Sequence, residues 1–136
     1  MREYIENNRE VLEELLYIDN QIMGDTLTIE NLLSEVESYI PYSFKNSLFF
    51  YDGDPCITLK LMNSNIEDSV FYPGYSYLGV NRFLTNFKEN IRLSMLKTDV
   101  FYEENQHQFD HIIVLQSEVL FEEVKKNYKN ALFIAL

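Results

Sequence analysis

The stretch SLFFYDGDPCITLKL, residues 47–61, lies where the periodicity of the chain changes from helical to extended. It begins with the aromatic run 47–51, passes through Asp52-Gly53-Asp54-Pro55, and then alternates apolar with polar residues over 57–61. Two extended runs on either side of a turn that contains Gly and Pro are typical of a β-hairpin. We therefore predict that a sheet begins here with a pair of adjacent strands.

Upstream of this stretch the apolar residues recur with helical spacing. The spacing predicts a helix over 4–23 that stops at Gly24, and a second helix over 28–40 that is capped by Thr28 and ends before Pro41. On a helical wheel the following residues of the first helix form its apolar, inward side: Ile5, Leu12, Leu15, Leu16, Ile22 and Met23.

Downstream, strand and helix patterns follow one another without a long linker. Strands are predicted at 69–72 and 75–78, on either side of Pro73-Gly74, and at 100–102, 109–115 and 131–136. Helices are predicted at 81–97 and from Ser117 to about 128. The segment 112–136 is about the shortest that permits a parallel βαβ unit, so a mixed sheet is an alternative to an antiparallel one.

These elements predict one α+β domain over residues 1–136, with an acidic helical segment 1–40 beside a strand-rich segment 41–136. The single cysteine, Cys56, cannot form an intramolecular disulfide, and no basic and then apolar signal segment opens the chain. The longest wholly apolar run, 131–136, is too short to cross a membrane. We expect a cytoplasmic protein that does not contact membranes.

Charge is the most informative property of the composition. The chain carries 11 Lys and Arg against 22 Asp and Glu, a net charge of -11, and the first 40 residues hold ten of the acidic residues but only two basic ones. This balance disfavours direct binding of nucleic acid and favours a basic partner. The predicted first helix places an anionic ridge on its outer side, formed by Glu3, Glu6, Glu10, Glu13 and Glu14 together with Tyr17.

Patterns typical of catalysis or cofactor binding are weak. The four glycines do not have the spacing of a phosphate-binding loop, and no local signature marks Cys56 as a nucleophile. Asp52 and Asp54 lack the further ligands of a calcium loop. Glu104, His107 and His111 would share one face of a helix, but the β-branched run after His111 favours a strand, so we predict no metal and no cofactor.

A second interaction signal is the loop that holds Tyr72, Tyr75 and Tyr77 around Pro73-Gly74. Tyrosine provides a large contact area with a polar tip, so these side chains are expected either to contact a partner or to pack in the core beside the turn. The anionic ridge likewise has a plainer interpretation, a solvated helix face whose charge is offset internally by Arg82, Lys88, Arg92 and Lys97.

The leading hypothesis is a non-enzymatic module that neutralises a basic protein, such as a toxin or a nucleic-acid enzyme, by covering its functional surface. In size, acidity and lack of catalytic motifs the chain resembles the general class of bacterial immunity proteins, antitoxins and phage-encoded inhibitors. Two alternatives belong to other classes. One is a small enzyme or ligand-binding domain with a site around Glu104, His107, Asp110 and His111, and the other is a self-associating structural or regulatory subunit that forms a homodimer.

Overall fold

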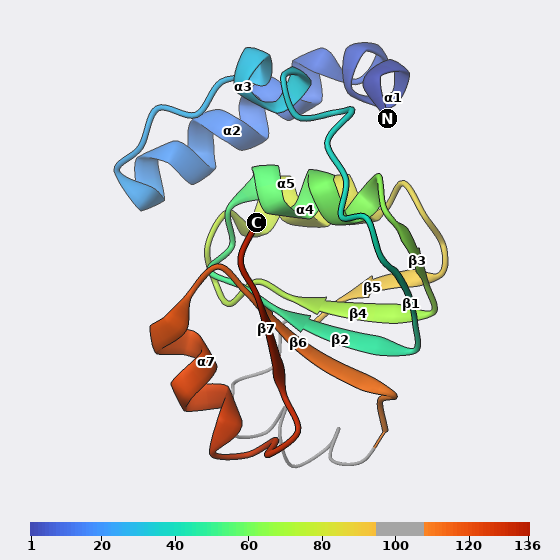
Figure 1. The fold of residues 1–136 in the computed structure, drawn as a ribbon. Helices are drawn as coiled ribbons and strands as arrows, with labels where there is room; N and C mark the ends of the chain where they lie inside the picture. Colours follow the sequence, from blue (N-terminus) through green and yellow to red (C-terminus); the bar gives the residue numbers. More distant parts are fainter. Residues whose placement is uncertain (95–107) are drawn as a thin grey trace.

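The computed structural model describes residues 1–94 and 108–136 (Figure 1). Its described helices are α1 (Arg2–Asn7), α2 (Arg9–Met23), α3 (Ile29–Leu33), α4 (Pro55–Met62), α5 (Leu78–Thr85) and α7 (Glu118–Lys125). Its described strands are β1 (Ser43–Lys45), β2 (Ser47–Phe50), β3 (Asn65–Glu67), β4 (Ser69–Tyr72), β5 (Ile91–Leu93), β6 (His111–Leu115) and β7 (Leu132–Ile134). None of these helices has the length and apolarity that a membrane crossing requires.

The main sheet has five strands in the order β5-β4-β2-β6-β7, and every pairing in it is parallel. From β2 the chain moves outward through β4 to β5, and the later strands β6 and β7 are added on the other side of β2. This order is that of an open, doubly wound α/β sheet. The predicted α+β class with a mixed or antiparallel sheet is therefore wrong.

The predicted hairpin is wrong because residues 57–61 belong to α4 rather than to a strand. Asp54 caps this helix by accepting a hydrogen bond from the backbone N–H of Cys56 at 2.9 Å, and Pro55 occupies its first turn. Both residue types favour a helix start at these positions. Most of α4 is buried, so apolar residues occur on nearly every side of it, which hides the helical period.

The strands β1 and β2 are two parts of one extended segment that bends at Asn46, and β3 and β4 are related in the same way through Asp68. Asn46 and Asp68 have φ angles of 50° and 51°, in the left-handed region. The register is the same on both sides of the bend, because Ser43 pairs with Asn65 and Leu48 pairs with Val70. The two neighbouring strands therefore bend at the same level.

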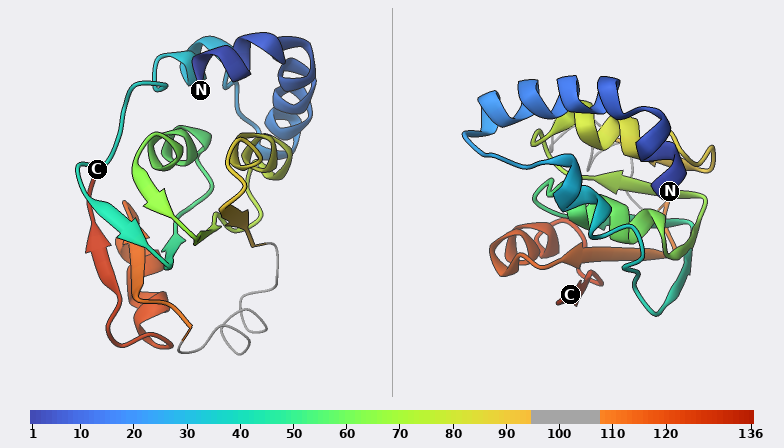
Figure 2. Two further views of the ribbon diagram at one scale, coloured as in Figure 1. Left: turned by 90° about the vertical axis from the view of Figure 1, so that its right-hand side faces the viewer. Right: turned by 90° about the horizontal axis from the view of Figure 1, so that it is seen from above.

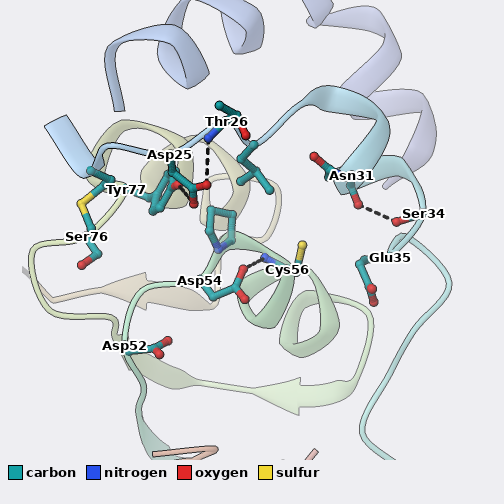
Figure 3. A pocket seen from close by; sticks show the side chains of 13 residues that line it. Asp25, Thr26, Asn31, Ser34, Glu35, Asp52, Asp54, Cys56, Ser76 and Tyr77 are labelled. Atoms are coloured by element: carbon teal, nitrogen blue, oxygen red, sulfur yellow. Dashed lines mark hydrogen bonds between the residues drawn. The ribbon is translucent and has the colours of Figure 1, made fainter. Parts of the chain in front are cut away.

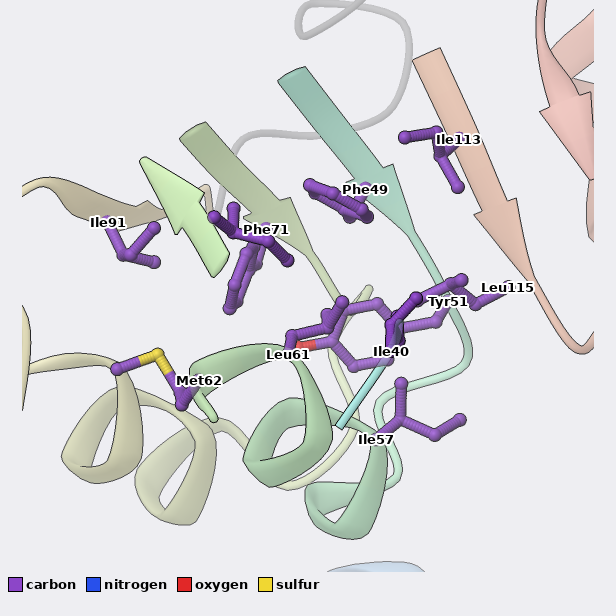
Figure 4. Packing of buried hydrophobic residues seen from close by; sticks show 11 residues of the cluster. Ile40, Phe49, Tyr51, Ile57, Leu61, Met62, Phe71, Ile91, Ile113 and Leu115 are labelled. Atoms are coloured by element: carbon purple, nitrogen blue, oxygen red, sulfur yellow. The ribbon is translucent and has the colours of Figure 1, made fainter. Parts of the chain in front are cut away.

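The helices form layers above and below the sheet, as the views in Figures 1 and 2 show. One apolar cluster joins a sheet face to α4 and contains Phe49, Phe71 and Ile113 (Figure 4). A second joins the opposite face to α7. A third joins α1, α2 and α3 to α4 and α5. Successive β2 side chains therefore point to opposite faces, and both faces of the strand are buried.

Several boundaries differ from the prediction. The first helical segment is divided at Asn8 into α1 and α2, although it ends as predicted at Gly24, which has a left-handed φ of 66°. Thr28 caps α3 as predicted, but that helix is only five residues long. Residues 75–78 form a turn that enters α5, and the helix predicted over 81–97 ends at Thr85, after which β5 follows.

The last part of the described chain agrees better with the prediction. The strand at the end of 109–115 is β6, and Ser117 caps α7 by accepting a hydrogen bond from the backbone N–H of Leu120. The parallel βαβ unit allowed by the spacing is present as β6-α7-β7. The predicted closing strand is shorter and lies at a sheet edge, where Leu132 is exposed, rather than in the core. The predicted strand at 100–102 lies outside the described residues.

Candidate functional site

A cavity of about 490 Å³ lies beside the carboxyl ends of β2 and β4 (Figure 3). Its floor comes from the segments that follow these strands, which contribute Asp52, Asp54 and Ser76. Its other walls come from the segment between α2 and α3 and from the segment after α3, which contributes Glu35. In open parallel sheets ligands bind in the crevice outside the carboxyl ends of the strands.

The two floor segments are held against each other at Gly53. Gly53 has a φ of 91°, and a Cβ atom there would lie 2.5 Å from Ser76 Cβ and 2.8 Å from the backbone oxygen of Pro73. Only glycine allows both the left-handed backbone and this close approach. The segment after β2 therefore meets the segment after β4 directly.

A buried amide fixes the same two segments from below. The Asn81 amide nitrogen donates hydrogen bonds to the backbone oxygens of Gly53 at 2.8 Å and of Ser76 at 3.0 Å. Its amide oxygen accepts a hydrogen bond of 2.6 Å from the Thr58 hydroxyl. Because Thr58 has one hydroxyl hydrogen, the Tyr51 hydroxyl must donate the 2.5 Å hydrogen bond between them. This chain of polar groups links α4, α5 and the floor of the cavity.

Tyr77 joins the upper wall of the cavity to the start of α5. Its hydroxyl donates a hydrogen bond of 2.6 Å to the Asp25 carboxylate, and its backbone is left-handed, with a φ of 51°. This hydrogen bond lowers the pKa of Asp25, whereas burial and the neighbouring carboxylate raise the pKa of Tyr77. A bulky residue in this backbone region is strained and persists only where its surroundings hold it in place.

The cavity is strongly anionic. Four carboxylates line it, those of Asp25, Glu35, Asp52 and Asp54, and none of the described residues that line it is Lys, Arg or His. The negative charge affects the half-buried thiol of Cys56. Desolvation, together with the nearby carboxylates of Asp54 and Glu35, raises the pKa of this thiol to about 12. The thiol is therefore protonated at neutral pH and is a poor nucleophile.

The geometry offers no place for a metal ion among the described residues, because no group of three or more His, Cys, Asp and Glu side chains is suitably arranged there. His111 lies exposed at the amino end of β6, the end of the sheet opposite to the cavity. Glu104 and His107 fall outside the described residues, so the predicted cluster is not tested. Asp52 and Asp54 face the cavity instead of a hairpin turn.

The outer side of α1 and α2 presents a second charged surface. All six members of the predicted anionic ridge are exposed, namely Glu3, Glu6, Glu10, Glu13, Glu14 and Tyr17. Arg9 lies 3.1 Å from Glu6, 3.7 Å from Glu13 and 3.3 Å from Glu30, so it offsets charge at one border. Within the part of the chain that the structure describes, the carboxylates of Glu3, Glu10 and Glu14 form no ion pair.

An exposed apolar stripe runs along α2 beside this ridge and was not anticipated from the sequence. It consists of Val11, Ile18 and Ile22, which are 53%, 54% and 74% exposed. The wheel placed Ile22 and Met23 on the inward side, but α2 extends beyond its supporting helices and leaves both exposed. The stripe could have been recognised from the spacing of Val11, Ile18 and Ile22, which places them on one side of the helix.

The tyrosine loop supplies less exposed surface than predicted. Tyr72 is buried against Phe50 and Tyr128 on the α7 side of the sheet, and Tyr77 is buried where α5 begins. Tyr75 alone of the three is exposed, at 54%. Tyr72 is buried because it belongs to β4, a strand that is buried on both faces. Tyr77 is buried because it immediately precedes α5, a helix of the interior.

Comparisons of the chain with protein-family models, with curated proteins and with solved structures find no match. Function is therefore inferred from the described residues, which form two distinct features. The first is the surface of α2, where the anionic ridge borders the apolar stripe. The second is the anionic cavity at the carboxyl ends of β2 and β4.

Proposed function

We propose that this chain is a non-enzymatic protein-binding module that captures a basic protein on the outer surface of α2. The observation that carries the proposal is the apolar stripe Val11, Ile18 and Ile22, which lies directly beside the part of the anionic ridge that α2 carries. A solvated helix face needs charge but has no need for a row of exposed branched apolar side chains. A binding surface needs both.

The two parts of this surface have different roles. The ridge attracts a positively charged partner from a distance, and that attraction weakens as salt increases. The stripe supplies apolar area that leaves water on contact, at roughly 25 cal/mol for each Å² buried. Tyr17, at 68% exposure, lies within the ridge and adds an aromatic anchor.

The dimensions favour covering a protein surface over imitating a nucleic acid. The 15 residues of α2 span about 22 Å at 1.5 Å per residue, which is short compared with a phosphate track. The apolar stripe has no counterpart in a phosphate backbone. The partner that fits is a toxin or nucleic-acid enzyme whose basic surface surrounds an apolar patch. Self-association through α2 is disfavoured because it would join two chains of charge -11.

The test is capture of partners from the native cell lysate by four immobilised proteins. The wild type is compared with a ridge variant, Glu10→Lys with Glu14→Lys, and with a stripe variant, Ile18→Ser with Ile22→Ser. The matched control, Glu118→Lys with Glu122→Lys, makes the same charge change at the same spacing on α7, whose two carboxylates are also exposed. Glu6 and Glu13 are left unchanged because both pair with Arg9.

We expect a basic protein to be retained by the wild type and by the α7 control, and to be lost from both α2 variants. Its affinity, measured afterwards with purified partner, should fall at least about tenfold in each α2 variant, which corresponds to 1.4 kcal/mol. Only the contribution of the ridge should depend strongly on salt. A partner that binds all four proteins equally would place the binding surface elsewhere. A stable dimer in light scattering, lost in the stripe variant, would replace the proposal with self-association.

A further inference from the structure

We propose that the cavity at the carboxyl ends of β2 and β4 binds a small organic polycation, with at least two separated ammonium groups. This site lies at the carboxyl end of the sheet and does not include the ridge or the stripe of α2. It would give the chain a ligand-binding activity in addition to the capture of a basic protein. The inference does not rest on the function proposed for α2.

The shape and position of the cavity suit a small ligand. Its volume of about 490 Å³ lies within the range of about 300–1,000 Å³ that small-molecule sites occupy. It lies where open parallel sheets bind their ligands, at the carboxyl ends of neighbouring strands. Its floor is fixed by the contact of Gly53 with Ser76 and by the hydrogen bonds of Asn81. The site is therefore organised before a ligand arrives.

The arrangement of charge determines the class of ligand. Glu35, Asp52 and Asp25 come from three separate segments, and Figure 3 shows them on different sides of the cavity. Carboxylates spread in this way do not form a coordination shell for a metal ion, and none suited to a metal occurs among the described residues. They match a flexible molecule that carries positive charges several ångströms apart.

The four carboxylates of the cavity differ in their hydrogen bonds to the described part of the chain. Asp25 accepts the hydrogen bond of Tyr77, and Asp54 caps α4. In contrast, the side chains of Glu35 and Asp52 accept no hydrogen bond from any described residue. The carboxyl end of α2 borders the cavity at Met23, and no basic residue occupies the last turn of that helix to offset its negative dipole. A bound ammonium group would relieve this excess of negative charge.

The raised pKa of the Cys56 thiol agrees with this electrostatic picture, since two of its causes are carboxylates of the cavity, Asp54 and Glu35. Cys56, Ser76 and Tyr77 all line the cavity. The chemical shifts of their backbone amides in a nuclear magnetic resonance spectrum therefore report on ligand binding there.

The experiment is titration of the purified chain with spermidine, followed by calorimetry and by amide chemical shifts. Butylamine serves as the probe with a single charge, and sodium chloride at matched ionic strength serves as the salt control. The cavity variant is Glu35→Gln with Asp52→Asn. The matched control is Glu118→Gln with Glu122→Gln, which removes the same charge from exposed positions on α7. Circular dichroism establishes that each variant is folded, and Asp52→Asn alone replaces the double variant if that one is not.

We expect spermidine to bind one site, to shift the amides of Cys56, Ser76 and Tyr77, and to bind at least about tenfold more tightly than butylamine. The cavity variant should bind spermidine at least about tenfold more weakly, a loss of 1.4 kcal/mol or more, while the α7 control should bind as the wild type does. Equal weakening in both variants, or shifts that sodium chloride reproduces, would overturn the proposal. Because the α2 variants are measured separately, failure here leaves the function proposed for α2 intact.

Discussion

The Tyr77 hydroxyl donates a hydrogen bond of 2.6 Å to the carboxylate of Asp25 across 52 residues of sequence. This bond connects the segment after α2 with the start of α5, both of which border the cavity. Tyr77 also has left-handed backbone angles, so the side chain and the backbone are held in place together.

Replacing Tyr77 with Phe should remove this hydrogen bond while keeping the buried ring. We expect a loss of about 1 kcal/mol in the free energy of unfolding, since Asp25 is exposed and water can replace the lost donor. Urea unfolding measures the loss. Loss of the hydrogen bond should also return the pKa of Asp25 toward its ordinary value, which carbon-detected titration measures. An unchanged pKa would contradict the role given to this bond.

Replacing Gly53 with Ala should be among the most damaging single changes in the cavity. The new methyl group would lie 2.5 Å from Ser76 Cβ and would require a non-glycine residue at a φ of 91°. We expect the free energy of unfolding to fall by about 2–4 kcal/mol, measured by urea unfolding. Gly74→Ala is the control, because Gly74 has a φ of 67° but meets no atom within 4 Å, so it carries the backbone strain without the collision.

Replacing Asn81 with Leu should separate the two floor segments without removing much volume. The backbone oxygens of Gly53 and Ser76 would lose their shared donor, and the Thr58 hydroxyl would lose its acceptor. Leaving these buried groups without partners costs about 3–5 kcal/mol in unfolding free energy. Thr58→Val removes the two hydrogen bonds of the Thr58 hydroxyl, with Tyr51 and with Asn81, but leaves both floor oxygens bonded to Asn81, so it should cost less. Equal costs for the two variants would show that the amide does not organise the floor.

Stability should fall as the pH rises above about 9. The folded pKa values of Cys56, Tyr51 and Tyr77 are all raised, so the unfolded chain releases these protons at lower pH than the folded chain does. The stabilisation is complete below the unfolded pKa values, which are about 8.5 for Cys and about 10 for Tyr, and it declines above them. Urea midpoints measured from pH 7.5 to pH 11 test this.

A Cys56→Ala variant isolates the cysteine contribution to this decline. It should move the onset from near pH 9 to near pH 10, because only the tyrosines then remain. Comparison of the pH at which each curve begins to fall, rather than of absolute stability, removes the effect of the lost thiol packing. An onset that does not move would show that the thiol is not perturbed in the folded protein.

Local signals predict several individual helices and strands, those with a capping residue or a clear apolar pattern, although they do not predict the class of the fold. Thr28 and Ser117 were recognised as caps, and the β-branched run 112–114 was recognised as a strand. The parallel sheet was missed because its central elements are buried on nearly all sides. In α4 the polar residues Thr58 and Lys60 alternate with apolar ones, a pattern that is also typical of a strand. Asp54, which caps this helix, belongs to a sequence that is equally typical of a turn.

The candidate sites depended even more on tertiary structure. The acidic ridge could be predicted because a helical wheel needs only local spacing. The spacing of Val11, Ile18 and Ile22 also places them on one side of the helix, but the exposure of Ile22 and Met23 could not be predicted, since it depends on where α2 stops touching the helices beneath it. The cavity unites residues from four separate segments. The strand order brings Asp52 beside Ser76, and the packing of α2 and α3 against α5 and α4 brings Asp25 and Glu35 to the same place.

Because β2 lies in the middle of the sheet, the sheet around it cannot be completed until β6 has been synthesised. The strand pairs on one side with β4, which follows shortly, and on the other with β6, where Phe49 meets Ile113. At about 5–20 residues per second, a ribosome adds the intervening residues only some seconds later. During that interval one edge of an almost wholly apolar strand has no partner of its own chain. Shortened chains that end before β6 should therefore aggregate, and conditions that slow translation should lower the yield of folded protein.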